Sequence, residues 1–141
     1  CDDDGQASRA VLYADWPAAN FQRDDLGAAA LAGRVFPSAP QPGRLHLLLK
    51  GTNFQLKVWE ALLKVAPATL VSYRQLATAL DMPQASRAVG SAVAANRIGY
   101  LIPCHRVIRE SGDSANYRWG IERKLALRAW EAGRAGISVG A

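Results

Sequence analysis

Residues 71–96 read VSYRQLATALDMPQASRAVGSAVAAN, and this stretch predicts the fold of the second half of the chain. Ser72 can cap a short helix whose apolar residues recur at three- and four-residue spacing. Asp81-Met82-Pro83 then makes a tight break, and a second helix follows from about Gln84 to Asn96. Two helices joined by a short turn, with small residues on the second, are typical of a helix-turn-helix that enters a DNA groove.

Helical spacing continues on both sides of this pair. Thr52 can cap a helix that ends at Ala66-Pro67, and Gly120 opens a last helix with an apolar side made of Leu125, Leu127, Ala129 and Trp130. Between them, residues 107–109 predict a short strand. We therefore expect residues 51–141 to form a mainly α-helical domain of the winged helix-turn-helix type.

Residues 1–50 predict a small α/β lobe. Strands are expected over residues 9–14 and 45–50, with a helix from Asp24 to Phe36 between them. The proline-rich segment 37–43 is expected to be a loop. Two strands are too few for an independent sheet, so this lobe would be partial and more sheet would lie upstream.

Composition and cysteine content exclude several classes of protein. Half of the 141 residues are apolar and 21% are charged, which is ordinary for a globular protein. No apolar run is long enough to span a membrane, and no secretion signal is visible. Cys1 and Cys104 lie too far apart for a disulfide framework or a C-x-x-C metal site, and reduced thiols suit a cytoplasmic location.

The basic residues are concentrated in the second half of the chain. Residues 51–141 carry twelve bases and six acids, a net of +6, and residues 1–50 carry five bases and six acids, a net of −1, which together give the overall +5. Four arginines and no acid lie between Met82 and Arg109. This distribution favours a polyanionic partner, most simply nucleic acid.

Cys104 lies in the segment Pro103-Cys104-His105-Arg106 and is a candidate nucleophile. A thiolate is the reactive form of cysteine, and a nearby histidine can take the thiol proton directly or through water. Adjacent side chains of an extended chain point to opposite faces, so contact requires a bend, which Pro103 favours. These residues alone leave open that Cys104 is an inert buried thiol.

Several segments, in the same order, resemble one family. Residues 102–107 (IPCHRV) resemble the active-site signature of the O6-alkylguanine-DNA alkyltransferases. Residues 51–59 (GTNFQLKVW), 71–77 (VSYRQLA), 86–90 (SRAVG) with Ala95-Asn96, and 117–120 (YRWG) with Arg123-Lys124 resemble further motifs of that family, the last of them those of its bacterial members. The resemblance covers residues 51 to about 132.

The resemblance implies a fold and a reaction. Residues 1–50 would be a truncated ribonuclease-H-like lobe, and residues 51–141 the winged helix-turn-helix alkyltransferase domain. The protein would flip O6-alkylguanine, or O4-alkylthymine, out of double-stranded DNA and move the alkyl group to Cys104 in a single turnover. It would need no cofactor or metal and would act as a monomer in the bacterial cytoplasm, associated with the nucleoid through DNA.

The resemblance also assigns roles to residues. Cys104 would accept the alkyl group, His105 would be a water-bridged base with Glu131 as its partner, and Asn96 would be a hinge. Arg87 would fill the space left by the flipped base, and Tyr73 would help to rotate the nucleotide. The remaining expected DNA contacts are Ser86, Ala88, Ser91, Arg97 and Arg106, and the expected substrate-binding residues are Val107, Tyr117, Arg118 and Trp119.

Three other functions remain open from the sequence. A lesion-recognition protein would bind alkylated DNA without transfer, although such proteins lack the acceptor cysteine that is present here. A winged-helix regulator could use Cys104 as a redox sensor, and a cysteine hydrolase could use it in multiple turnovers. Trp119 is expected to narrow the substrate pocket and to disfavour bulky groups such as benzyl.

Overall fold

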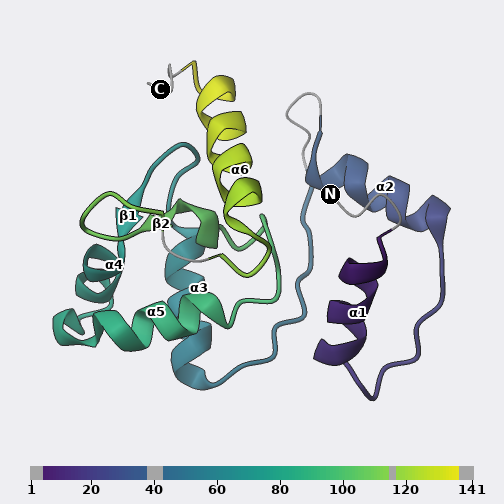
Figure 1. The fold of residues 1–141 in the computed structure, drawn as a ribbon, viewed down its shortest axis with the longest axis horizontal. Coiled ribbons are helices and arrows are strands. Elements are labelled where there is room, and N and C mark those ends of the chain that lie inside the picture. The colour runs from purple at the N-terminus through teal and green to yellow at the C-terminus, as the bar shows by residue number, and fades with distance from the viewer. Residues whose placement is uncertain (1–4, 38–42, 115–116, 137–141) are drawn as a thin grey trace. The chain divides into compact units, whose positions relative to one another are not determined.

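The computed structural model describes residues 5–37, 43–114 and 117–136, and the chain divides into two compact units, Cys1–Arg44 and Leu45–Ala141 (Figure 1). The described residues are mostly helical, with one small two-stranded sheet. None of the described helices is both long and apolar enough to cross a membrane.

The second unit contains the helix pair that residues 71–96 predict. Its elements are, in order, α3 (Asn53–Leu63), β1 (Val71–Ser72), α4 (Tyr73–Ala79), the 3-10 turn η1 (Pro83–Ala85), α5 (Ser86–Ala94), the 3-10 turn η2 (Cys104–Arg106), β2 (Val107–Ile108) and α6 (Ile121–Arg134). The two strands are parallel, with Val71 opposite Val107 and Ser72 opposite Ile108. This ladder brings the segment after Cys104 beside the start of α4.

The predicted caps Thr52 and Ser72 start α3 and α4, and the structure shows that each forms a capping box. The Thr52 hydroxyl accepts a hydrogen bond from the Gln55 backbone N–H at 3.2 Å, and the Gln55 side chain accepts one from the Thr52 N–H at 2.9 Å. Ser72 and Gln75 make the same exchange at 3.1 and 2.7 Å. Each box satisfies two backbone N–H groups that a helix start leaves unpaired, which fixes where both helices begin.

The core of this unit holds α5 against α3. Val58 and Leu62 of α3 and Val89 of α5 are fully buried. The Trp59 indole N–H of α3 also donates to the Ala92 carbonyl of α5 at 2.8 Å. A buried hydrogen bond between two packed helices fixes their register as well as their separation. The outer face of α5 is therefore presented in a defined orientation.

The predicted strand over residues 9–14 is wrong, because these residues lie in α1 (Gln6–Asp15). The one helix predicted in the first unit, from Asp24 to Phe36, is confirmed as α2 (Asp25–Val35), where the Asp24 carboxylate accepts from the Gly27 N–H at 2.8 Å. A strand needs a neighbour to satisfy its backbone groups, whereas a helix satisfies them within the segment. The described residues of the first unit contain no strand. The predicted α/β, ribonuclease-H-like lobe is therefore corrected to a helical one.

The segment 45–50 has the side-chain alternation of a strand without a strand partner. Leu45, Leu47 and Leu49 are half-buried, whereas the three residues that alternate with them are exposed. Leu47 and Leu49 pack against the core of the second unit. No described strand pairs with this segment, so the strand predicted over residues 45–50 is wrong.

The last helix buries polar residues rather than the apolar side predicted from the sequence. Leu125 is 49% exposed and Trp130 38% exposed, while Lys124, Glu131 and Ala132 are buried. Lys124 and Glu131 are seven residues apart, which places them on the same face of the helix. That face covers η2, so α6 contributes charged groups to the interior of the molecule.

Candidate active site

Cys104 begins the turn η2 and is 4% exposed. Its own backbone N–H donates to the Ile102 carbonyl at 2.7 Å, and the Arg106 N–H donates to the Pro103 carbonyl at 3.0 Å. These two bonds bend the chain at the position where Pro103 predicts a bend. The turn buries both Cys104 and His105.

Asn96 connects the end of α5 to the segment that carries Cys104. Its side-chain Nδ2 lies 2.9 Å from the Ile98 carbonyl, 3.1 Å from the Ile102 carbonyl and 3.2 Å from Cys104 Sγ. Its Oδ1 accepts from the Ile98 N–H at 2.9 Å. The side chain is almost completely buried. These contacts tie the end of α5 to the segment that carries Cys104.

His105 and Arg106 meet on the carboxylate of Glu131. His105 is fully buried, and its Nε2 lies 3.0 Å from Glu131 Oε1. The Arg106 Nη2 donates to Oε1 at 2.6 Å and its Nε to Oε2 at 3.0 Å. Ala68 donates its backbone N–H to Oε2 at 3.3 Å, and Arg106 Nη1 also donates to the Val65 carbonyl. Glu131 is thus held on several sides and fixes the edge of the imidazole.

The prediction that Arg106 contacts DNA is wrong in this structure. Its guanidinium is buried and committed to Glu131 and Val65. A buried carboxylate needs a charged partner, and the residue after His105 is close enough to supply one. Arg106 therefore belongs to the support of the site and not to the exposed basic surface.

The Nδ1 atom of His105 is buried and has no hydrogen-bond partner among the described residues. With Nε2 at the Glu131 carboxylate, the neutral imidazole carries its proton on Nε2 and leaves Nδ1 as an acceptor. Buried polar atoms of native proteins are nearly always hydrogen-bonded, to protein or to water. Nδ1 is accordingly the atom through which His105 can receive a proton.

Burial keeps both partners of the Cys104–His105 pair neutral at rest. Burial raises the pKa of the Cys104 thiol, against hydrogen bonds from Asn96 and Tyr117 that lower it. Burial lowers the pKa of His105, against the hydrogen bond and charge of Glu131. For Glu131, burial acts to raise the pKa, but the hydrogen bonds from Arg106 and His105 leave it below its ordinary value. The site thus holds a thiol, a neutral base and a carboxylate.

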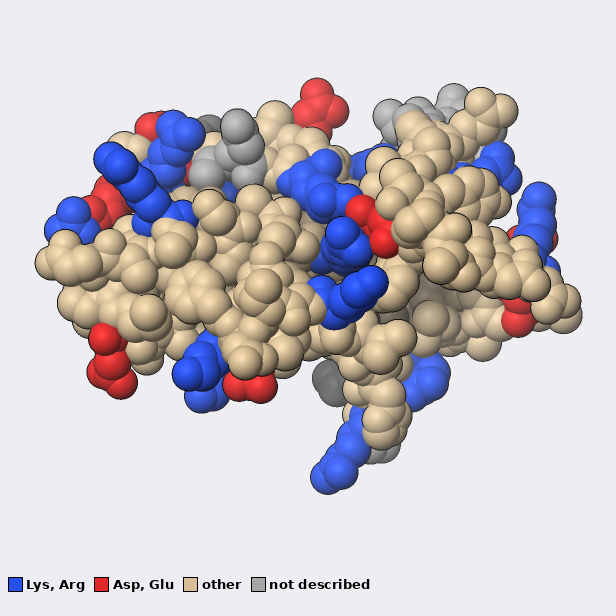
Figure 2. All heavy atoms as spheres, turned by 90° about the horizontal axis from the view of Figure 1, so that it is seen from below, with Lys and Arg blue, Asp and Glu red and all other residues tan. Residues whose placement is uncertain are grey.

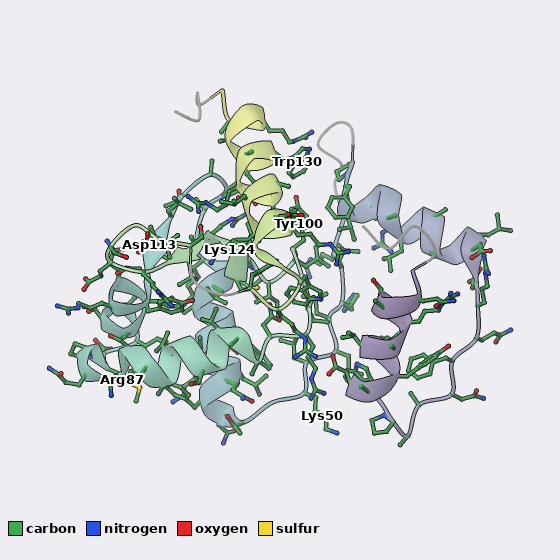
Figure 3. The ribbon with its side chains drawn as sticks, viewed as in Figure 1. Lys50, Arg87, Tyr100, Asp113, Lys124 and Trp130 are labelled. Atoms are coloured by element: carbon green, nitrogen blue, oxygen red, sulfur yellow. The ribbon has the colours of Figure 1, made fainter. Side chains whose placement is uncertain are left out.

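Lys124, which the sequence placed in a family motif without a role, is a buried member of the site. It is 1% exposed, and its Nζ donates to the Val107 carbonyl at 2.6 Å (Figure 3). Burial lowers the pKa of Lys124 from 10.5 to about 8, and the charge of Cys104 acts against that shift. The seven-residue spacing from Glu131 is a sequence signal that could have placed Lys124 inside.

A cavity of about 20 Å³ lies over Cys104. It is lined by Tyr73, Val93, Ala94, Asn96, Cys104, Tyr117, Arg118 and Trp119. The predicted substrate residues 117–119 therefore meet at the sulfur. Val107 is fully buried, with its N–H bonded to the Cys104 carbonyl and its own carbonyl bonded to Lys124. The cavity has room for about one water molecule, so a base requires the walls to move.

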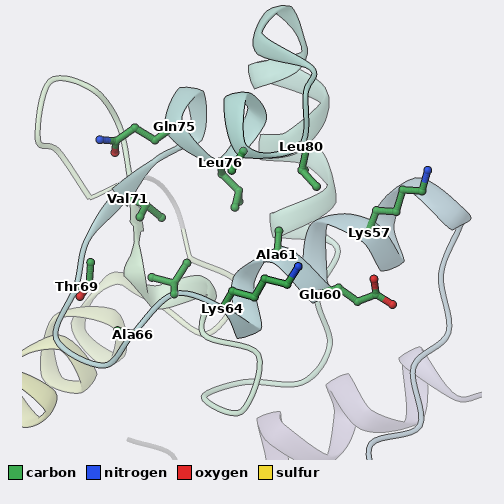
Figure 4. A pocket seen from close by; sticks show the side chains of 12 residues that line it. Lys57, Glu60, Ala61, Lys64, Ala66, Thr69, Val71, Gln75, Leu76 and Leu80 are labelled. Atoms are coloured by element: carbon green, nitrogen blue, oxygen red, sulfur yellow. The ribbon is translucent and has the colours of Figure 1, made fainter.

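A larger hollow lies between α3 and α4 and has a different character (Figure 4). Leu76 and Leu80 form part of its wall, together with Lys57 and Glu60 of α3 and Lys64 directly after that helix. None of its lining residues is a cysteine or a histidine. The buried cysteine lies at the smaller cavity.

The outer face of α5 carries the predicted DNA contacts. Arg87, Ala88 and Ser91 are exposed, and Ser86 at the start of the helix is half-buried. Arg97 follows the helix and is also exposed. Figure 3 shows Arg87 on this helix, and Figure 2 shows Lys and Arg side chains spread over the face seen from below, with acidic side chains among them. Small residues flanked by cations suit a close approach to a phosphate backbone.

The fold and the site together define a class of helical proteins that hold a buried cysteine–histidine–glutamate centre behind an exposed helix of small residues. The profile described as "6-O-methylguanine DNA methyltransferase, DNA binding domain" matches residues 53–133, more than half of the chain. The chain belongs to the family of 6-O-methylguanine DNA methyltransferases.

Individual relatives agree with this assignment. The chain is 42% identical over 133 residues to the "Bifunctional transcriptional activator/DNA repair enzyme Ada" of Escherichia coli, over 92% of this chain and 38% of that protein. It is 45% identical over 91 residues to a methylated-DNA–protein-cysteine methyltransferase of Mycobacterium tuberculosis, over 64% of this chain and 55% of that protein. The chain thus spans about two fifths of the Escherichia coli relative and just over half of the mycobacterial one.

Solved structures show the same likeness. The crystal structure of Mycobacterium tuberculosis OGT in complex with DNA matches with a TM-score of 0.68 and 40% sequence identity, covering 77% of this chain and 67% of that one. The O6-methylguanine-DNA methyltransferase of Pyrococcus kodakaraensis matches with a TM-score of 0.66 and 25% identity, over 92% of this chain and 80% of that one.

Proposed function

We propose that this chain repairs DNA by direct reversal, moving the alkyl group of O6-alkylguanine or O4-alkylthymine in double-stranded DNA to Cys104 in a single turnover. The observation that carries the proposal is the buried series Cys104, His105 and Glu131, in which the carboxylate holds Nε2 at 3.0 Å and leaves Nδ1 as the acceptor. Membership of the family supports the same reaction.

The residues of the site account for each step of the reaction. The Cys104 thiol gives its proton to His105 Nδ1 through a bridging water, and Glu131 stabilises the imidazolium that forms. The thiolate attacks the alkyl carbon, the bond from that carbon to the base oxygen breaks, and its electron pair goes to the base. Burial raises the pKa of Tyr117 above its ordinary value, so its hydroxyl stays protonated. That hydroxyl can donate a hydrogen bond or a proton to the departing base.

The product explains why the protein acts once. The new thioether at Cys104 has no good leaving group, so none of the groups around it can restore the thiol. The reaction needs no metal or cofactor, because the thiolate is the only nucleophile and the base is the leaving group.

We propose that α4 and α5 act as a helix-turn-helix, with the two short strands as part of a winged arrangement across residues 51–141. The exposed Ala88 and Ser91 of α5 would lie in the minor groove, and Arg87 would enter the stack where the base has left. Cys104 is 4% exposed, so the lesion must be flipped out to reach it. We expect a monomer that acts on nucleoid DNA in the bacterial cytoplasm.

Mass spectrometry after incubation with a methylated duplex tests the proposal. The unaltered protein is expected to gain the mass of one methyl group on Cys104, whereas Cys104→Ser gains none. Binding to the duplex without any mass gain would instead identify a lesion-recognition protein. Repeated turnover of an ester or amide would point to a hydrolase.

A further inference from the structure

Tyr100 lies over His105 in an unusual backbone conformation. Its φ angle is 60°, in the left-handed region that few residues other than glycine adopt. Its ring is nearly parallel to the His105 imidazole, with 8° between the planes and 6.0 Å between the centroids. The Trp130 ring of α6 meets the Tyr100 ring edge-on, at 5.7 Å and 70° (Figure 3).

This arrangement continues along α6. The Arg134 guanidinium lies 5.0 Å from the centroid of the Trp130 ring, in the geometry of a cation–π contact. Trp130 is thereby supported on one side by Arg134 and supports Tyr100 on the other. A left-handed tyrosine costs about 1 kcal/mol or more, and such a conformation persists where the surroundings enforce it. Here the surroundings are these aromatic contacts.

His105 needs a contact on its ring face, because its known hydrogen bond constrains only one edge. The contact with Glu131 fixes the position of Nε2 but does not by itself fix the tilt of the imidazole plane. A small tilt would move Nδ1 away from the line on which it can receive the thiol proton. Proton transfer depends steeply on such geometry.

We propose that Tyr100 is a positioning residue for His105, whose ring holds the imidazole in the plane where Nδ1 serves Cys104 and keeps bulk water off that face. The inference rests on the proposed alkyl transfer, since it assigns Tyr100 a part in that reaction. The aromatic ring carries this role, and the hydroxyl does not.

The charged groups around His105 fix the direction of the expected pH effect. Glu131 and Lys124 face it from α6, and Arg106 faces it from η2. Burial is the largest cause that lowers the pKa of His105, followed by the opposing hydrogen bond of Glu131. Removing the Tyr100 ring admits water and weakens the effect of burial. The pKa of His105 then rises, and the base is lost by protonation at a higher pH than in the unaltered protein.

Single-turnover transfer from a methylated duplex, measured from pH 5.5 to 9, tests the inference with two substitutions. Tyr100→Asn removes the ring and keeps a residue that tolerates a positive φ, whereas Tyr100→Phe keeps the ring and removes the hydroxyl. We expect Tyr100→Asn to lower the limiting rate about tenfold, which is less than the roughly 10²–10⁴-fold contribution of a general base because His105 itself remains. Its acid limb should move to higher pH, and half-saturation by DNA should not change. Tyr100→Phe should behave as the unaltered protein.

The outcomes separate this inference from the proposed function. If the unaltered protein transfers no methyl group, the proposed function fails and the inference with it. If it transfers normally and Tyr100→Asn has the same rate and pH profile, Tyr100 does not position His105. An equal loss in both variants would assign the effect to the hydroxyl and also overturn the inference. Tyr100→Gly, which removes the backbone strain, gives the same comparison should Tyr100→Asn not fold.

Discussion

Replacing Lys124 by Met should change how the stability of the second unit depends on pH. Burial lowers the pKa of Lys124 from 10.5 to about 8 in the folded protein. At about 1.4 kcal/mol per pH unit, this burial of a charged lysine destabilises the folded state by about 3 kcal/mol at neutral pH. The destabilisation is complete below pH 8 and disappears as the pH rises toward 10.5, the pKa of Lys124 in the unfolded chain. In this range the unfolded chain still binds the lysine proton and the folded protein has lost it, so stability rises with pH.

The expected effect of pH can be measured as the difference in unfolding free energy between the unaltered protein and Lys124→Met. Between pH 7 and pH 9.5, linkage gives the unaltered protein about 2 kcal/mol of stability from Lys124 that Lys124→Met cannot gain. Cys104 and Tyr117, whose pKa values burial raises, act in the opposite direction but do so in both proteins. At pH 7 the variant also leaves the Val107 carbonyl without its hydrogen bond, which costs about 1–3 kcal/mol and offsets much of the gain.

Urea unfolding at the two pH values provides the assay, since its midpoint and slope give the free energy of unfolding at each pH. Arg123→Met is the matched control, because it removes one positive charge from an exposed neighbour on the same helix. We expect the control to follow the pH dependence of the unaltered protein. A constant difference between Lys124→Met and the unaltered protein from pH 7 to pH 9.5 would refute the reasoning.

Three further outcomes are expected. Trp59→Phe removes the hydrogen bond to the buried Ala92 carbonyl and should lower the free energy of unfolding by about 1–3 kcal/mol. Urea denaturation measures this loss, and an unchanged midpoint would contradict the prediction. Arg87→Ala should slow transfer from a methylated duplex about tenfold or more and leave the reaction with free O6-methylguanine unchanged, because flipping costs a few kcal/mol; equal losses on both substrates argue against this role. Trp119 should make inactivation by free benzylguanine slower than by methylated DNA, and comparable rates would show that it does not narrow the pocket.

Local signals in the sequence predicted most elements of the second unit. Thr52 and Ser72 each precede a glutamine by three residues, and both capping boxes are present. The break before Pro83 is also present, although a 3-10 turn occupies residues 83–85 and α5 begins at Ser86. These features succeed because the interactions that decide them lie within a few residues along the chain.

The same kind of signal failed where its partner had to come from elsewhere. Residues 9–14 and 45–50 have strand-like composition, but the described structure offers neither a strand to pair with. On α6, apolar spacing favoured Leu125 and Trp130 for the interior, yet the helix buries Lys124 and Glu131. Hydrophobicity alone could not show this, because a buried charge is tolerated only where a specific partner lies opposite.

The sequence by itself determined the helix pair, the cysteine in its turn and the family resemblance, because motifs and caps are properties of neighbouring residues. The resemblance also paired Glu131 with His105, and the structure places the two side chains in contact across 26 positions. Only the tertiary structure showed that Arg106 is committed to that carboxylate. It also buries Lys124 and lays Tyr100 over the imidazole. These contacts depend on packing α6 against the turn, and the energy of burying each charge depends on distances that no linear pattern contains.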